Sequence, residues 1–288
     1  MRILLVHNPD AGDEEAKPDE LIKTLARAGH EVVYQSSKKE QKLKRALKSR
    51  LDLVLVAGGD GTLGKVARQL VGRKLPLSVL PSGTANNLAR TFGFWAPAKE
   101  LIGQLAKGER TGFDVGRARG PWGKWYLFEA LGAGLLADHL YQHEWKDQEE
   151  KSGSPAEQMR RHVRELRRRV RNHPARAWKI ELDGKDFSGR YLLWQAMNIR
   201  SVGPVLTLAP QAAPDDGQFD FVERGKMIER SSSSIWRRGW RAGNRSFPCR
   251  AIVSKRCVSA GKRGRSISMT KSGRRKMRNV PRPAQSSY

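Results

Sequence analysis

The sequence predicts an α/β domain followed by a mainly antiparallel β-sandwich and a basic C-terminal tail. Over residues 1–112, apolar segments alternate with helical patterns, which is typical of a parallel sheet with helices on both faces. Over residues 113–223, short apolar segments separated by turn residues favour an antiparallel sandwich. Residues 224–288 are rich in Arg, Ser and Gly without a sustained period, so we expect this tail to be disordered.

The first domain should contain strands that are each followed by a helical pattern. The strands are expected at residues 2–7, 31–35, 51–56 and 77–80. The segment 51–56 is apolar except for Asp52, as expected of a strand buried on both faces. The segment after it has apolar residues at helical spacing, namely Leu63, Val66, Ala67 and Leu70.

The second domain should contain short strands and one helical insertion. The strands are expected at residues 113–118, 125–131, 178–182, 190–199, 205–208 and 219–222. Asp183-Gly184 has the composition of a hairpin turn. The insertion, residues 141–177, has an apolar helical stripe at Met159, Val163, Leu166 and Val170, with arginines on the other faces. This helix either lies on anionic lipid or packs on the sandwich with a solvated arginine face.

The net charge of +26 is concentrated in the tail. Residues 224–288 hold 19 Lys and Arg against one acid, which leaves 36 against 28 in residues 1–223. The tail therefore carries +18 and the body +8, so the total charge does not indicate that the body binds nucleic acid. Both cysteines, Cys249 and Cys257, also lie in the tail, and a body without a disulfide framework suits a reducing cytoplasm.

A glycine-rich turn, Gly58-Gly59-Asp60-Gly61-Thr62, follows the third strand. Glycines let a ligand approach backbone N–H groups, and a helix N-terminus attracts phosphate. We therefore predict that this turn contacts the phosphates of a nucleotide. Asp60 would repel them unless it holds Mg²⁺ or accepts a proton from an attacking hydroxyl, and the sequence leaves both roles open. The simpler alternative is an ordinary turn with Thr62 as an N-cap.

A second small-residue loop follows the next strand and reads Pro81-Ser82-Gly83-Thr84-Ala85-Asn86-Asn87-Leu88-Ala89-Arg90. The carboxyl ends of parallel strands meet at one edge of a sheet, so the two loops should face one crevice. We expect Ser82, Gly83 and Thr84 to line the wall opposite the first loop.

Together these motifs resemble the diacylglycerol kinase catalytic domain family, which is related to sphingosine kinases. The likeness rests on Asn8-Pro9, the two loops, and Ala209-Pro210 followed by Pro214-Asp215-Asp216-Gly217, in this order. Gly-Gly-Asp-Gly-Thr alone would also fit NAD kinases and phosphofructokinases. The resemblance covers roughly residues 1–224. It implies the two-domain fold above, with an active site in the cleft between the domains.

The resemblance also implies roles for individual residues. Asn8, Gly12 and Ser37 match positions that contact the nucleotide, although Ala11 replaces the usual serine of the first loop. Asp60 is the predicted essential carboxylate. Asp216, with the main-chain oxygens of Ala213 and Gln218, matches a structural Mg²⁺ site, and such oxygens suit this ion. Without the resemblance, Pro214-Asp215-Asp216-Gly217 would be interpreted as a β-turn.

Two features depart from the family pattern. Gly64-Lys65 stands where the family usually has Asn-Glu. The tail contains no Asp and only Glu229, whereas relatives carry an acidic Asp-Gly-Glu-like motif there that is thought to bear the general base. We hypothesise that residues 224–288 are a frameshifted reading. Resequencing the locus tests this, and a neighbouring frame without an aspartate- and valine-containing continuation would refute it.

The sequence thus predicts a cytoplasmic, peripherally membrane-associated lipid kinase that uses ATP and Mg²⁺. Its reaction would transfer the γ-phosphoryl group to a lipid hydroxyl, with diacylglycerol as the favoured substrate at the membrane surface. One alternative is a catalytically impaired nucleotide-fold protein whose basic tail binds nucleic acid or membrane, with a steep dependence on ionic strength. The other is an NAD or sugar kinase, which the loop at residues 81–90 disfavours.

Overall fold

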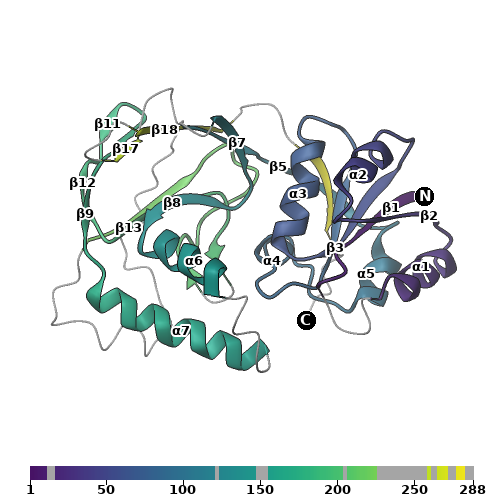
Figure 1. Ribbon diagram of the computed structural model, residues 1–288. Coiled ribbons are helices and arrows are strands. Elements are labelled where there is room, and N and C mark those ends of the chain that lie inside the picture. Colours follow the sequence, from purple (N-terminus) through teal and green to yellow (C-terminus); the bar gives the residue numbers. More distant parts are fainter. Residues whose placement is uncertain are drawn as a thin grey trace.

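The computed structural model describes residues 1–11, 17–120, 123–146, 155–203, 206–225, 258–260, 265–271 and 277–282. Two regions of different architecture lie side by side in Figure 1. The first is built on a four-stranded parallel sheet in the order β2-β1-β3-β4, flanked by helices as predicted. Its elements are β1 (Arg2–His7), α1 (Pro18–Arg27), β2 (Glu31–Ser36), α2 (Glu40–Ala46), β3 (Leu53–Gly58), α3 (Asp60–Leu70), β4 (Leu77–Pro81), α4 (Asn87–Thr91) and α5 (Ala98–Gln104).

The aliphatic strands form the centre of this sheet. β3 is buried along its whole length, and β1 is buried after its first residue. β1 pairs with both β2 and β3, and β3 pairs with β4, in each case in parallel. Their carboxyl ends therefore lie at one edge of the sheet. α3 starts directly after β3 and buries the predicted apolar face of Leu63, Val66, Ala67 and Leu70.

The second region is rich in antiparallel strands, as predicted. β8, β13 and β16 form one antiparallel sheet, and β12, β9, β17, β18, β6 and β7 form another. The Asp183-Gly184 turn joins the hairpin of β10 and β11, and both residues have positive φ, at 51° and 79°. The elements up to residue 225 are β5 (Glu109–Phe113), β6 (Gly116–Gly120), β7 (Gly123–Leu127), β8 (Ala130–Gly134), α6 (Leu135–Lys146), α7 (Pro155–Asn172), β9 (Arg176–Lys179), β10 (Glu181–Leu182), β11 (Lys185–Asp186), β12 (Gly189–Tyr191), β13 (Leu193–Met197), β14 (Ser201–Val202), β15 (Leu206–Thr207) and β16 (Asp220–Arg224).

Some details of this region differ from the sequence prediction, and the strands expected at 178–182 and 190–199 are each divided, into β9 and β10 and into β12 and β13. The single strand expected at 125–131 is interrupted, because β7 ends at Leu127 and β8 begins at Ala130. Helix α6 was not predicted. In α7, Leu166 is buried in a core cluster and Val170 packs against that cluster, so the helix packs on the sandwich. The structure thus favours the second of the two interpretations of this helix.

The tail contributes three strands that its composition did not predict, namely β17 (Val258–Ala260), β18 (Arg265–Lys271) and β19 (Met277–Arg282). β17 pairs with β9 and β18, and β18 pairs with β6. β19 pairs with β5 and lies beside β4, so the tail returns to the first region (Figure 1). Backbone pairing of this kind tolerates an unusual composition, because its hydrogen bonds join main-chain groups. Cys249 and Cys257 fall outside the described residues.

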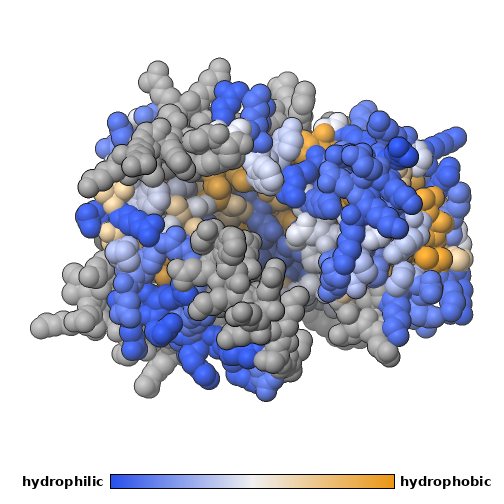
Figure 2. Space-filling view, in the orientation of Figure 1, coloured by the Kyte–Doolittle hydropathy of each residue, from blue (hydrophilic) through white to orange (hydrophobic). Residues whose placement is uncertain are grey.

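The apolar core of the first region extends into the second. It includes Phe128 and Ile199 beside the aliphatic residues of β1 and β3. In Figure 2, hydrophobic residues are visible in the recess between the two regions, while hydrophilic residues cover most of the visible face of the first. Among the described residues, none of the helices combines the length and hydropathy required to cross a membrane.

Candidate active site

The two small-residue loops meet at the carboxyl edge of the parallel sheet. A Cβ atom added to Gly83 would lie 2.5 Å from the Cα atom of Gly59, so the two backbones leave no space for a side chain at this contact. Asn86, with a left-handed φ of 49°, braces the second loop, because its Oδ1 accepts the Gly83 N–H at 3.0 Å. The two loops therefore contact each other, as the sequence predicts, while the crevice itself stays a prediction.

Asp60 joins the two loops. Its Oδ2 accepts the N–H of Asn87 at 2.8 Å, and its Oδ1 accepts the N–H of Leu88 at 3.0 Å. Both donors belong to the first turn of α4, whose N–H groups have no partner within the helix. The carboxylate of Asp60 thus fixes the start of α4 against the start of α3. This role was not predicted from the sequence.

Glu129 is the functional candidate that sequence reasoning missed. It lies in the turn between β7 and β8, and its Oε2 accepts a hydrogen bond from Asn87 Nδ2 at 3.0 Å. Burial is the main cause that raises the pKa of Glu129 to about 7; the charge of Asp60 raises it further, and the Asn87 hydrogen bond opposes the change. The sequence predicts one continuous strand at 125–131, in which Glu129 has no special position. The turn between β7 and β8 places its side chain beside Asn87.

The predicted residues of the first two strands also lie at this edge. The N–H of Asn8 donates to Ala57 O at 2.9 Å, and the N–H of Ser37 donates to His7 O at 2.8 Å. Lys65 Nζ donates to Ser37 O at 2.8 Å, so the unusual lysine of α3 tethers this helix to the end of β2. Gly12 lies outside the described residues.

The remaining loop residues differ in exposure. The N–H of Ser82 donates to Gly58 O at 3.3 Å, while Ser82 Oγ is buried without a hydrogen-bond partner in the described part of the chain. Thr84 and Gly61 are exposed, and Thr62 is partly exposed in the first turn of α3.

The turn predicted to hold a metal lies in the second region, apart from the two loops. Asp114, which the sequence analysis did not single out, receives the Gly217 N–H on its carboxylate, and its own N–H donates to Pro214 O at 2.6 Å. Asp216 is exposed, and its Oδ1 accepts the N–H of Gln218 at 2.8 Å. One carboxylate and main-chain carbonyls are ligands of the type that Mg²⁺ accepts together with water. The described residues contain no cluster of three or more His, Cys, Asp or Glu that could hold a metal ion.

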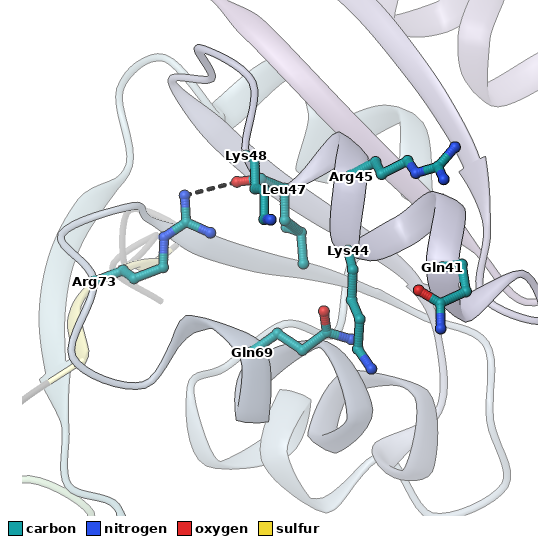
Figure 3. A pocket seen from close by; sticks show the side chains of 7 residues that line it. All are labelled: Gln41, Lys44, Arg45, Leu47, Lys48, Gln69 and Arg73. Carbon is teal, nitrogen blue, oxygen red and sulfur yellow. Dashed lines mark hydrogen bonds between the residues drawn. The ribbon is translucent and has the colours of Figure 1, made fainter.

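A basic hollow of about 360 Å³ lies elsewhere, between α2 and α3 (Figure 3). In it, Arg73 Nη2 donates to Leu47 O at 2.7 Å and so satisfies a carbonyl at the end of α2. The residues that line it are Gln41, Lys44, Arg45, Leu47, Lys48, Gln69 and Arg73. None of the predicted nucleotide or metal residues belongs to this hollow.

The sequence model of the diacylglycerol kinase catalytic domain matches residues 2–118, a segment that contains both loops. The diacylglycerol kinase of Bacillus subtilis (strain 168) is 27% identical over 232 residues, which cover 77% of this chain and 73% of that protein. The diacylglycerol kinase of Staphylococcus aureus (strain MRSA252) is 27% identical over 239 residues, or 79% of this chain and 72% of that protein.

Solved structures share the fold of this chain. A chain from Bacillus anthracis str. Sterne superposes with a TM-score of 0.68 at 19% identity, covering 94% of this chain and 93% of that chain. A diacylglycerol kinase from the same strain gives a TM-score of 0.63 at 18% identity, and 94% of each chain is covered. These similarities support a kinase, and they do not favour the binding-protein alternative or the NAD and sugar kinase alternative.

Proposed function

We propose that this chain transfers the γ-phosphoryl group of ATP to the hydroxyl of diacylglycerol or a closely related lipid. The observation that carries this proposal is the contact of the two small-residue loops at one sheet edge, with Asp60 bonded across them. Phosphoryl transfer depends on positioning and charge neutralisation more than on covalent chemistry of the protein. A rigid cradle of backbone donors at a helix start supplies that positioning.

In this proposal each loop has a distinct task. Gly58, Gly59, Gly61 and Thr62 bind the phosphates at the start of α3, and Ser82, Gly83 and Thr84 form the opposite wall. Asn8, Gly12 and Ser37 contact the rest of the nucleotide. The essential carboxylate is Asp60, which holds the two loops in register.

Magnesium has two proposed places. Mg²⁺ bound with ATP would neutralise phosphate charge during transfer. A second, structural Mg²⁺ would be held by Asp216 and by the main-chain oxygens of Ala213 and Gln218, with Asp114 supporting the turn. Substituting Asp216 by Asn should then lower the midpoint of thermal unfolding in Mg²⁺ but not in EDTA. A midpoint equally lowered in both conditions would contradict a metal at this turn.

We also propose peripheral contact with the inner membrane surface, where the lipid substrate is met. The apolar side of α7 is packed on the protein, while Arg160, Arg164, Arg168 and Arg171 are exposed. Such contact would be electrostatic and weakened by salt. Changing these four arginines to Gln should reduce co-sedimentation with anionic liposomes, and unchanged binding would exclude this surface. Filter binding of nucleic acid by the full chain tests the competing role of the tail.

The decisive test uses labelled ATP, Mg²⁺ and a panel of diacylglycerol, sphingosine, NAD and sugar phosphates. We expect label in diacylglycerol, and at least about a hundredfold less in Asp60→Ala, because the loops lose the bond that aligns them. Asp19→Ala, an exposed acid in the first turn of α1, serves as the matched control and should retain full activity. Label in NAD or in a sugar would refute the lipid kinase assignment.

A further inference from the structure

Phosphoryl transfer to a lipid hydroxyl requires a group that receives the hydroxyl proton, and the sequence leaves this group open. The tail holds no Asp and one Glu, so an acidic motif is missing there. Asp60 is engaged by two backbone N–H groups, one on each carboxylate oxygen. A carboxylate committed to these donors is suited to hold the loops together. A second carboxylate close to it would complete the chemistry.

Glu129 is such a carboxylate, and the fold anchors it firmly. Its neighbour Phe128 is buried in the core of the first region and stacks on Phe113, with ring centroids 6.3 Å apart. Asn198 is fully buried, and its Nδ2 donates to Phe128 O at 2.8 Å while its N–H donates to Glu129 O at 2.7 Å. These contacts fix the turn between β7 and β8 against the core of the first region. Glu129 is thereby a residue of the second region held at the edge of the first.

The side chain of Glu129 keeps one oxygen available. Oε2 accepts the bond from Asn87, and within the described part of the chain Oε1 has no hydrogen-bond partner. The residue is partly exposed. The groups that face it there are the Asp60 carboxylate and the Asn87 amide. A pKa of about 7 means that the side chain both accepts and releases a proton near neutral pH.

We propose that Glu129 is the general base of this chain, a proposal that rests on the proposed lipid kinase function. Oε1 of Glu129 accepts the proton of the lipid hydroxyl while the hydroxyl oxygen forms a bond to the γ-phosphorus of ATP. The bond between that phosphorus and the β,γ-bridging oxygen breaks, and ADP leaves with the electron pair. The products are a lipid phosphate monoester, ADP and protonated Glu129, which then releases its proton to water.

The test compares Glu129→Gln with the wild type and with Glu181→Gln, an exposed glutamate of β10 in the same region. Gln can still accept the bond from Asn87 but cannot take up a proton at neutral pH. Binding of a non-hydrolysable ATP analogue and turnover with diacylglycerol in mixed micelles are measured from pH 5.5 to 9. We expect Glu129→Gln to bind the analogue within threefold of the wild type while kcat falls by about 10² to 10⁴. Glu181→Gln should match the wild type in both measurements.

The pH profile separates chemistry from a structural role. Wild-type kcat should rise with pH through an ionisation near 7. This acidic limb should be absent from the residual activity of Glu129→Gln and present in Glu129→Asp, which keeps a carboxylate and should recover part of the rate. If the wild type phosphorylates diacylglycerol and the kcat of Glu129→Gln is within threefold of the wild-type value, the role of Glu129 is overturned and the proposed function stands. A wild type that binds no adenine nucleotide would instead overturn the proposed function itself.

Discussion

The two regions of the molecule are stabilised in different ways. The parallel sheet is held by many aliphatic side chains, with Leu4, Leu5, Val54, Leu55 and Val56 fully buried in adjacent strands. One core cluster of the sandwich contains a group of aromatic rings, in which Trp194 lies near Trp178 and Phe221 at centroid distances of 5.8 and 6.2 Å. The aliphatic residues of the parallel sheet are consecutive within each strand. The aromatic contacts of the sandwich form only after strands that are distant in the sequence have come together. Loss of one residue should therefore affect the two regions unequally.

The strongest expected effect is on the sandwich. Trp194→Ala should destabilise the second region by about 3–5 kcal/mol, because the ring is fully buried and its removal leaves a cavity. Urea unfolding measures the loss, and hydrogen exchange locates it. Exchange should rise in β8, β13 and β16 while β1 and β3 remain protected. Equal loss of protection in both regions would show that they unfold as one unit.

The free energy of unfolding should depend on pH through Glu129, which lies where the two regions meet. Its pKa in the folded state lies above the ordinary value of 4.5. The contribution of Glu129 to the free energy of unfolding is therefore fully present below pH 4.5 and is lost as the pH rises through 7. A pKa of about 7 corresponds to a loss of about 3 kcal/mol. Glu129→Gln removes this dependence. The free energy of unfolding of the variant should therefore exceed that of the wild type more at pH 8.5 than at pH 5, and parallel pH profiles would contradict the burial of this carboxyl group.

The loop contact can be broken within the first region. Gly83→Ala would place a Cβ 2.5 Å from Gly59 Cα, so the loops must separate, at about 1–3 kcal/mol of stability. Nucleotide affinity, measured by calorimetry, should fall by at least about tenfold because the donors lose alignment. Gly103→Ala is the matched control, since a Cβ at this position of α5 meets no atom within 4 Å. It should be neutral or slightly stabilising.

The smallest effect should come from the tether between α3 and β2. Lys65→Met removes the bond from Nζ to Ser37 O and should lower stability by about 1 kcal/mol. Lys99→Met, at an exposed position of α5, should change it by less than about 0.5 kcal/mol. Chemical denaturation of both variants gives the comparison. If Lys65→Met impairs nucleotide binding more than stability, Lys65 acts on the ligand directly.

Prediction from sequence succeeded where the signal is local. The β3 segment and the helical spacing from Leu63 to Leu70 each follow from the adjacent residues alone. The turn at Phe128-Glu129 was missed because its apolar neighbours continue a strand-like pattern on both sides. The three tail strands were missed because they pair with strands that are distant in the sequence, namely β9, β6 and β5. β5 and β6 lie more than a hundred residues before the tail strands that pair with them.

The sequence by itself determined the α/β order of the first region, the two small-residue loops and the similarity to the diacylglycerol kinase catalytic domain. These features depend on short segments whose residue types restrict the backbone directly. Only the tertiary structure decided that Asp60 bonds across to α4 and that Glu129 lies beside Asn87. The first contact joins residues 27 positions apart within the first region, and the second joins residues 42 positions apart across the two regions, so no local pattern encodes either of them.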